Sequence, residues 1–262
     1  MRFRPCIDIH NGKVKQIVGG SLAESAGESV ASENYVSAQG AAWFAALYKE
    51  KGLAGGHIIL LNKAGTPEYE ADLIQAEAAL TAWPDGLMIG GGINADNASE
   101  FLSLGASHVI VTSYLFEKGA FVIDRLTELA GKIGPEHLVI DLSCRKRDGT
   151  YYVVTKRWQK FTDLAVTKEL LQELSCYCDE FLVHGVDQEG LGQGMEEELV
   201  KILASYVRDG GKKVTYAGGI GSLADLAAFQ EMSGGVLDVT VGSALKIFGG
   251  EIALEEIEEM CE

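Results

Sequence analysis

The 262-residue sequence is poor in proline, with four residues, and poor in basic side chains, with 22 Lys and Arg against 38 Asp and Glu. The resulting net charge of −16 predicts that neither nucleic acid nor an anionic membrane is a partner. A phosphorylated small molecule stays possible, because backbone N–H groups at helix N-termini bind phosphate whatever the net charge. The sequence shows neither a long apolar run nor a charged segment followed by an apolar one, so we expect neither a membrane span nor a signal peptide.

The five cysteines are an odd number and lack the spacing of a disulfide framework. Reduced thiols of this kind are typical of a cytoplasmic protein, which is the location we expect. Cys176 and Cys178 are separated by one residue rather than two, and no histidine stands at ligand spacing beside them. The pattern therefore predicts no metal site.

Two short apolar segments each carry one aspartate near the carboxyl end, CIDIH with Asp8 and LVIDLS with Asp141. A buried carboxylate is costly unless it is paired or used in chemistry, so both are candidate catalytic residues. Either one alone could be a helix cap or a turn residue, but the recurrence half a chain later weakens that alternative. We expect the two carboxylates to lie over one site.

Apolar segments alternate with helical patterns along the sequence, which indicates a parallel sheet covered by helices. We expect strands within 3–14 and at 57–61, 87–89, 108–112, 137–142, 181–184, 213–216 and 237–241. We expect helices at 39–51, 68–82, 96–104, 163–176, 196–208, 222–232 and 253–260, one within 118–131, a long loop at 19–36 and a hairpin at 145–156. Eight units in this length predict an α/β fold, a single (β/α)8 TIM barrel over 1–262, in preference to an open doubly wound sheet.

Two further motifs recur about half a chain apart. Gly91-Gly92 corresponds to Gly218-Gly219, and Thr112-Ser113 corresponds to Gly242-Ser243. Together with the two aspartates they predict an internal duplication, with half-barrels roughly at residues 1–134 and 135–262.

Each glycine pair follows a strand and precedes a helix, where backbone N–H groups can approach a phosphate closely. One such pair alone would indicate only a turn. Two matched pairs, each beside a strand that ends in hydroxyl residues, predict two phosphate sites on opposite sides of the barrel mouth.

Nearly the whole sequence resembles one family, the phosphoribosylformimino-aminoimidazole carboxamide ribotide (ProFAR) isomerases of histidine biosynthesis. The segments that carry the resemblance are, in chain order, IDIHNGKV, GGGI, VIVTS, VIDLS, a hairpin followed by Trp158, HGVDQEG, AGGI and VGSAL. Each segment is weak alone, whereas their order and spacing are specific. The opening CIDIHNGKVKQIVGG and the late KIFGG resemble the eukaryotic-type branch.

The resemblance implies an Amadori rearrangement of the bis-phosphorylated aminoaldose ProFAR to the aminoketose PRFAR, without a metal or other cofactor. Asp8 would be the general base at C2 of the sugar, and Asp141 the general acid that protonates the ring oxygen. Trp158 would stack on the substrate as its loop closes. Further substrate contacts, at positions where the family often has a hydroxyl residue and an aspartate, are implied for His184, Glu189 and Gly190.

The sequence also departs from the common bacterial pattern, which has arginines where this chain has Gln16, Asn94 and Ser243. Positive charge for the phosphates would then come from Lys15, Arg145 or Lys246, or the backbone alone would bind them. The remaining histidines at strand starts, His57, His108 and His137, are expected to be structural and to lie at the far end of the barrel from the site.

The nearest alternative is the cyclase subunit of imidazole glycerol phosphate synthase, which shares the duplicated barrel and needs a glutaminase partner. A non-catalytic phosphosugar-binding barrel is more remote, and a second activity on the anthranilate analogue stays open. Because two halves complete one closed barrel, we expect a monomer whose only partner is its small-molecule substrate.

Overall fold

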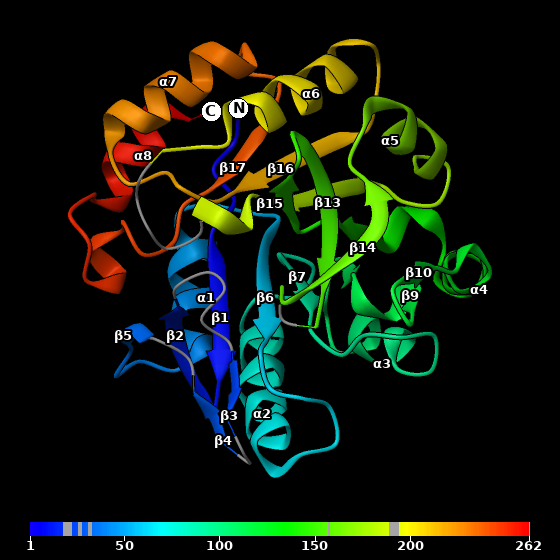
Figure 1. The fold of residues 1–262 in the computed structure, drawn as a ribbon. Helices are drawn as coiled ribbons and strands as arrows, with labels where there is room; N and C mark the ends of the chain where they lie inside the picture. The colour runs from blue at the N-terminus through cyan, green and yellow to red at the C-terminus, as the bar shows by residue number, and fades with distance from the viewer. Residues whose placement is uncertain (18–22, 26–27, 31–32, 157, 189–193, 262) are drawn as a thin grey trace.

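The computed structural model describes residues 1–17, 23–25, 28–30, 33–156, 158–188 and 194–261. Its centre is a ring of parallel strands (Figure 1). In order around the ring they are β1 (Cys6–His10), β6 (Gly56–Leu60), β7 (Leu87–Gly90), β8 (Val109–Val111), β11 (Leu138–Asp141), β15 (Glu180–His184), β16 (Lys213–Ala217) and β17 (Asp238–Thr240). The ring closes because Phe3, just before β1, pairs in parallel with Val239 of β17. The predicted (β/α)8 barrel is therefore confirmed.

A helix follows each barrel strand, and the helices surround the sheet (Figure 1). They are α1 (Ala41–Glu50), α2 (Pro67–Ala82), α3 (Ala98–Ser103), α4 (Ile123–Ile133), α5 (Lys168–Leu174), α6 (Glu197–Arg208), α7 (Leu223–Ser233) and α8 (Leu254–Met260). Thr66, Thr167 and Ser222 cap α2, α5 and α7, since each hydroxyl accepts a hydrogen bond from a backbone N–H in the first turn. In the described ranges, no helix is long and apolar enough to cross a membrane.

The predicted hairpin after β11 is present and continues into a third strand. It consists of β12 (Cys144–Arg147), β13 (Thr150–Thr155) and β14 (Lys160–Ala165), and it turns at Asp148 and Gly149, whose φ angles are 50° and 81°. The expected helix at 163–176 is wrong in its first part, because residues 160–165 pair with β13 and the helix begins only after the Thr167 cap. A further short pair, β9 (Phe116–Glu117) with β10 (Ala120–Phe121), was not predicted.

The strand expected within residues 3–14 ends at His10, and the chain reverses at Asn11 and Gly12 into β2 (Lys13–Ile17). Strand β5 (Glu33–Val36) adds to β2, so the barrel sheet gains two antiparallel strands at the carboxyl end of β1. The long loop expected at 19–36 thus contains strands, including β3 (Ala23–Ser25) and β4 (Glu28–Val30), and part of it lies outside the described residues.

Side chains inside the barrel form layers, because residues two apart on a strand point to the same face. The lowest layer is ionic: Arg4 contacts Asp238 at 2.9 Å and Glu180 at 3.7 Å, and Arg4 and Glu180 are almost fully buried. Above it is an apolar layer of Met88, Ile110, Val139 and Leu182, with Ile59 packed against it. The strand ends above that apolar layer are the ones that surround the site.

We expect Arg4→Ala to lower the free energy of unfolding by about 3–5 kcal/mol, because it leaves the buried carboxylate of Glu180 without its cation. Chemical denaturation followed by circular dichroism measures the change. Arg2→Ala is the matched control, since Arg2 is exposed and contacts Asp238 through its backbone N–H. Equal stabilities of the two variants would contradict a structural role for the ionic layer.

Candidate active site

A cavity of about 740 Å³ opens at the carboxyl ends of the barrel strands. Every barrel strand or the turn directly after it contributes to its lining. Active sites of this fold lie at that end of the barrel, since the loops that follow the strands surround it. This cavity is therefore the candidate active site.

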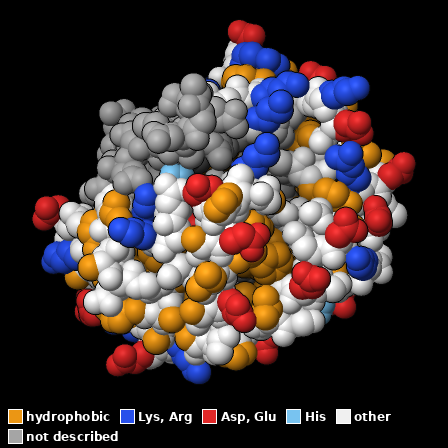
Figure 2. Space-filling view, turned by 90° about the horizontal axis from the view of Figure 1, so that it is seen from below, with side chains coloured by type: hydrophobic (Ala, Val, Ile, Leu, Met, Phe, Trp, Pro, Cys, Tyr) orange, Lys and Arg blue, Asp and Glu red, His pale blue; other side chains and the backbone are white. Residues whose placement is uncertain are grey.

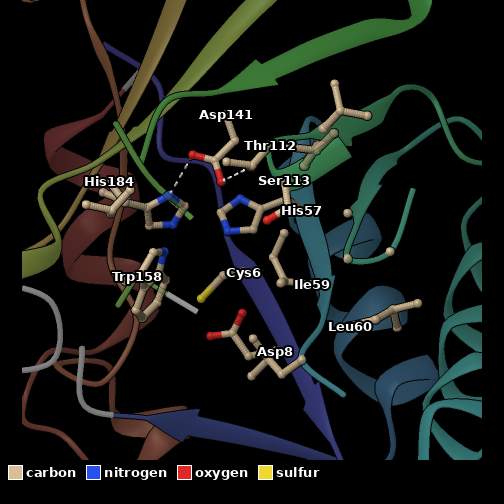
Figure 3. A pocket seen from close by; sticks show the side chains of 18 of the residues that line it. Cys6, Asp8, His57, Ile59, Leu60, Thr112, Ser113, Asp141, Trp158 and His184 are labelled. Atoms are coloured by element: carbon tan, nitrogen blue, oxygen red, sulfur yellow. Dashed lines mark hydrogen bonds and ion pairs between the residues drawn. The ribbon is translucent and has the colours of Figure 1, made fainter. Parts of the chain in front are cut away.

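Asp8 and Asp141 both line the cavity and point into it from opposite sides (Figure 3). Asp8 is on β1 and Asp141 ends β11, and these strands lie four places apart in the closed ring. The sequence prediction that the two carboxylates meet over one cavity agrees with this placement.

The carboxylate of Asp141 is surrounded by hydrogen-bond donors. Its Oδ1 accepts hydrogen bonds from the backbone N–H and from the hydroxyl of Ser143, both at 2.8 Å. Its Oδ2 accepts a hydrogen bond from the Thr112 hydroxyl, also at 2.8 Å. The Nδ1 atom of His184 lies 3.5 Å from Oδ1. Burial raises the pKa of Asp141, but hydrogen bonds from His184, Thr112 and Ser143 outweigh that effect and leave the pKa below its ordinary value.

The carboxylate of Asp8 has a different environment. Its Oδ2 lies 3.5 Å from the side-chain amide nitrogen of Gln16, which also lies 3.6 Å from the sulfur of Cys6. The amide oxygen of Gln16 packs on Gly242, where an added Cβ would approach it to 2.3 Å. Gln16 therefore links the position of Asp8 to the backbone after β17.

The two glycine pairs have matching conformations. The φ angles are 98° and 72° at Gly91 and Gly92, and 121° and 80° at Gly218 and Gly219, so all four lie in the region that favours glycine. A Cβ on Gly91 would lie 2.1 Å from the carbonyl oxygen of Leu60, and one on Gly218 would lie 2.7 Å from that of Gly185. In both halves the backbone thus passes close to the end of the preceding barrel strand.

The other residues predicted for the site are mostly at the cavity. Thr112, Ser113, Gly242 and Ser243 line it beside the glycine pairs. Trp158 lines it from the connection between β13 and β14, with its ring centroid 6.1 Å from that of His184. Its φ of 65° is unusual for a bulky residue, which is the kind of backbone strain found at ligand-binding positions. Two more predicted residues, Glu189 and Gly190, lie outside the described residues.

The prediction for His57 is wrong. His57 is almost fully buried and lines the floor of the cavity, where it pairs in register with Cys6 and its ring lies 6.2 Å from that of His184 (Figure 3). Burial, helped by the charge of His184, lowers the pKa of His57 to about 3, so its imidazole is neutral. The cavity reaches down to the first inward-facing residue of β6, so a histidine at the start of a strand still lines it. His108 and His137 pack together away from the cavity, as expected.

The basic side chains at the cavity are not those that the sequence suggested. Lys15 is buried, Arg145 forms an ion pair at 2.6 Å, and Lys246 is exposed, and none of them belongs to the described lining. Lys63 and Lys156 line the cavity instead. Sequence reasoning missed them because both are in connections between elements and neither belongs to a motif.

Comparison with known proteins agrees with this geometry. The profile of the family described as histidine biosynthesis protein matches residues 2–253. The chain belongs to that family. It is 48% identical to the 1-(5-phosphoribosyl)-5-((5-phosphoribosylamino)methylideneamino)imidazole-4-carboxamide isomerase of Yarrowia lipolytica, over 95% of this chain and 93% of that protein.

Two further members of the family have the same isomerase name. The Medicago truncatula protein, described as chloroplastic, is 47% identical over 98% of this chain and 80% of its own length. The Saccharomyces cerevisiae protein is 43% identical over 99% and 97%. The chain is thus a family member similar to isomerases of fungi and plants, as its sequence motifs indicated.

The phosphate-binding role of the glycine pairs stays a prediction, and Gly92→Ala tests it. The new methyl group would meet the hydroxyl of Tyr69 at 2.9 Å, and that hydroxyl donates a hydrogen bond to the carbonyl of Gly91. We expect the KM for a phosphorylated substrate to rise about tenfold, the loss of roughly one charge-assisted hydrogen bond.

The matched control is Gly210→Ala. Gly210 also has a positive φ, 86°, but an added Cβ would meet open space, and the residue does not belong to the described lining of the cavity. It therefore reports backbone strain alone. If the two variants have the same KM, the assignment of the glycine pair to phosphate binding fails.

Proposed function

We propose that this chain catalyses the Amadori rearrangement of ProFAR to PRFAR, with Asp8 and Asp141 providing acid–base catalysis. The observation that carries the proposal is one cavity with two carboxylates on opposite strands, between two matched glycine turns. The substrate of the related isomerases carries two phosphoribosyl groups by name, one for each glycine turn. The identities of 47% and 48% to such isomerases over nearly the whole chain support the same reaction.

The rearrangement needs one acid and one base on opposite sides of the sugar. Protonation of the ring oxygen breaks its bond to C1, and the nitrogen lone pair forms the C=N bond of a Schiff base. Removal of the proton from C2 then gives an enolamine, which becomes the aminoketose when C1 gains a proton and the 2-hydroxyl loses one. Asp8 takes the role of the base at C2, and the Asp141 side of the cavity supplies the acid.

The different environments of the two aspartates suit this division. Asp141 has its oxygens held by Thr112 and Ser143, so its position is fixed on the β11 side. Asp8 contacts Gln16 at the 3.5 Å limit of a hydrogen bond and faces the cavity. Two carboxylates with unlike surroundings can take unlike roles in one reaction.

The phosphates need positive charge because acidic side chains are spread over the molecular surface, as one face shows (Figure 2). Lys63 is exposed at the cavity, next to Ala64, which lies close to Gly92. No described carboxylate forms an ion pair with Lys63 or Lys156. We assign Lys63 to the phosphate at the first glycine pair, where it would replace the arginine that the common bacterial pattern has at the position of Asn94. We assign Lys156 to the side of the cavity that the hairpin covers.

The aromatic ring of Trp158 has the role of covering the substrate. Its place over the cavity next to His184 excludes water from the Schiff base, which would otherwise hydrolyse. The exposed Lys156 lies on the same connection between β13 and β14 as Trp158, and it also lines the cavity.

The rival functions are less well supported. A cyclase subunit would share the cavity, but the related proteins of Yarrowia, Medicago and Saccharomyces are isomerases by name. A non-catalytic phosphosugar-binding barrel would not need carboxylates from β1 and β11. A monomer in the cytoplasm stays our expectation. The free thiols are compatible with that compartment, while the Medicago relative is chloroplastic.

We expect Asp8→Asn and Asp141→Asn each to reduce kcat by about 10²–10⁴-fold, because each removes one partner of the proton transfers. The measurement is a spectroscopic assay with purified protein and the bis-phosphorylated aminoaldose alone, without glutaminase or ammonia. Asp124→Asn, an exposed carboxylate on α4, is the control for a generic change of charge.

The assay also decides between the rival functions. Conversion of the aminoaldose by the wild-type protein excludes the cyclase. Turnover of the aminoketose with ammonia, and only then, would indicate the cyclase. Wild-type rates in both aspartate variants would contradict the acid–base assignment.

We expect Lys63→Gln to raise KM about tenfold with little change in kcat, since it removes charge from a phosphate remote from the reacting carbons. The difference from wild type should shrink at high salt because exposed charges are screened. Lys212→Gln is the matched control, an exposed lysine just before β16 at the opposite end of the barrel. A KM equal to that of the control would overturn the assignment.

A further inference from the structure

One fully buried carboxylate has no part in the proposed reaction. Asp72 lies on α2, which packs against β1 and β6 (Figure 1), and its side chain has no exposed surface, whereas the other acidic residues of that helix are exposed. Burial raises the pKa of Asp72 to about 6, although hydrogen bonds from backbone N–H groups act in the opposite direction, so the side chain is mostly ionised at neutral pH. If packing were the only requirement, an apolar residue would fill this position at lower cost.

Asp72 joins two turns that lead into the cavity. Its Oδ1 accepts a hydrogen bond at 2.8 Å from the backbone N–H of Gly12, in the turn between β1 and β2. Its Oδ2 accepts one at 3.4 Å from the backbone N–H of Asn62, in the connection between β6 and α2. A carboxylate has two acceptor oxygens and can serve both N–H groups at once, whereas a side-chain amide has one acceptor and one donor.

The two turns are also bound to each other. The backbone N–H of Asn11 donates to Oδ1 of Asn62 at 2.7 Å, and Nδ2 of Asn62 donates to Oδ1 of Asn11 at 2.8 Å. The φ angles of Asn11 and Gly12 are 54° and 69°, and a Cβ added to Gly12 would lie 3.1 Å from that of Ala71, the neighbour of Asp72. The turn therefore packs tightly on α2, and Asn62 is held by both α2 and the turn.

The connection between β6 and α2 carries two residues that line the cavity. Asn62 is buried there, and the exposed Lys63 follows it directly. The other turn begins at the end of β1, the strand of Asp8. The hydrogen bonds around Asp72 therefore fix the backbone of Lys63 relative to that of Asp8.

We propose that Asp72 is a positioning residue, which holds the connection between β6 and α2 so that Lys63 meets the phosphate at the first glycine pair. The inference rests on the proposed function and adds a residue that touches neither the substrate nor the reacting atoms. A fixed ammonium group binds a phosphate more tightly than a freely moving one, because less conformational freedom is lost on binding. Asp72 thus contributes to affinity for the phosphorylated substrate rather than to the proton transfers.

The first test is Asp72→Asn. The new amide oxygen can still accept from Gly12, but the amide nitrogen would face the N–H of Asn62, so the connection loses its acceptor. We expect KM to rise about three- to tenfold, with kcat within about threefold of wild type. Glu77→Gln neutralises an exposed carboxylate on the same helix and is the control that should keep the wild-type KM.

The decisive measurement is a double-mutant cycle with Lys63→Gln. We expect Lys63→Gln to raise KM about tenfold in the wild-type background but no more than about threefold in the Asp72→Asn background, because the ammonium group is already out of place there. The full effect should remain in the Glu77→Gln background. If Asp72 served stability alone, the effects of Asp72→Asn and Lys63→Gln on KM would multiply, and that result would overturn the inference.

A second variant leaves the buried position intact. Asn11→Gly keeps the positive φ of an exposed turn residue and removes the side-chain oxygen that accepts from Asn62. We expect a smaller rise in KM, about two- to threefold, and again a weaker effect in the Lys63→Gln background. If Asp72→Asn does not fold, an unchanged KM in Asn11→Gly overturns the inference.

The same cycle in a binding assay separates this inference from the proposed function. The probe is ribose 5-phosphate, titrated by calorimetry, which needs no turnover. Wild-type protein that fails to convert the aminoaldose contradicts the proposed function, while the binding of the probe still tests the role of Asp72. Coupling between Asp72→Asn and Lys63→Gln in the Kd of the probe supports the inference. Independent effects, or no effect of Asp72→Asn, overturn it.

Discussion

The parallel pairing of Phe3 with Val239 is the contact on which the arrangement of the site depends. It places β1 between β6 and β17 and converts a curved sheet into a closed ring. Only in a closed ring do β1 and β11 lie opposite each other, so that Asp8 and Asp141 face one another across a single cavity. In an open sheet the same residues would lie along one edge, and a substrate could not contact both from opposite sides.

Because side chains two residues apart on a strand point to the same face, the inward-facing residues of each strand lie in successive layers of the barrel. On β15 the inward residues are Glu180 in the ionic layer, Leu182 in the apolar layer and His184 at the cavity. The apolar layer separates the ionic layer from the site, so the Arg4 cluster lies away from the cavity that Asp8 and Asp141 line. This division agrees with the general behaviour of such barrels, in which the carboxyl ends of the strands hold the reacting groups.

Most of the fold could be predicted from sequence because buried strands, glycine turns and the Asp148-Gly149 hairpin each have a strong local signal. The helix expected from residue 163 was wrong in its first part because KFTDLA pairs with β13, a contact that local spacing does not show, and only the Thr167 cap marks where the helix begins. His57 was missed because nothing local shows how deep a cavity extends. Lys63 was missed because it belongs to no motif, and only the fold brings its neighbour Ala64 close to the Gly92 turn. Local patterns identify elements, whereas contacts between distant loops need the closed barrel.

The two aspartates lie in unlike environments although both line the same cavity. Three donors, the backbone N–H and the hydroxyl of Ser143 and the hydroxyl of Thr112, hold the carboxylate of Asp141 in place. The carboxylate of Asp8 lies at the limit of hydrogen-bond distance from the amide of Gln16, and it faces the cavity. The sequence motifs mark both aspartates alike, whereas the neighbours that distinguish them, Gln16 for one and Thr112 with Ser143 for the other, are visible only in the fold.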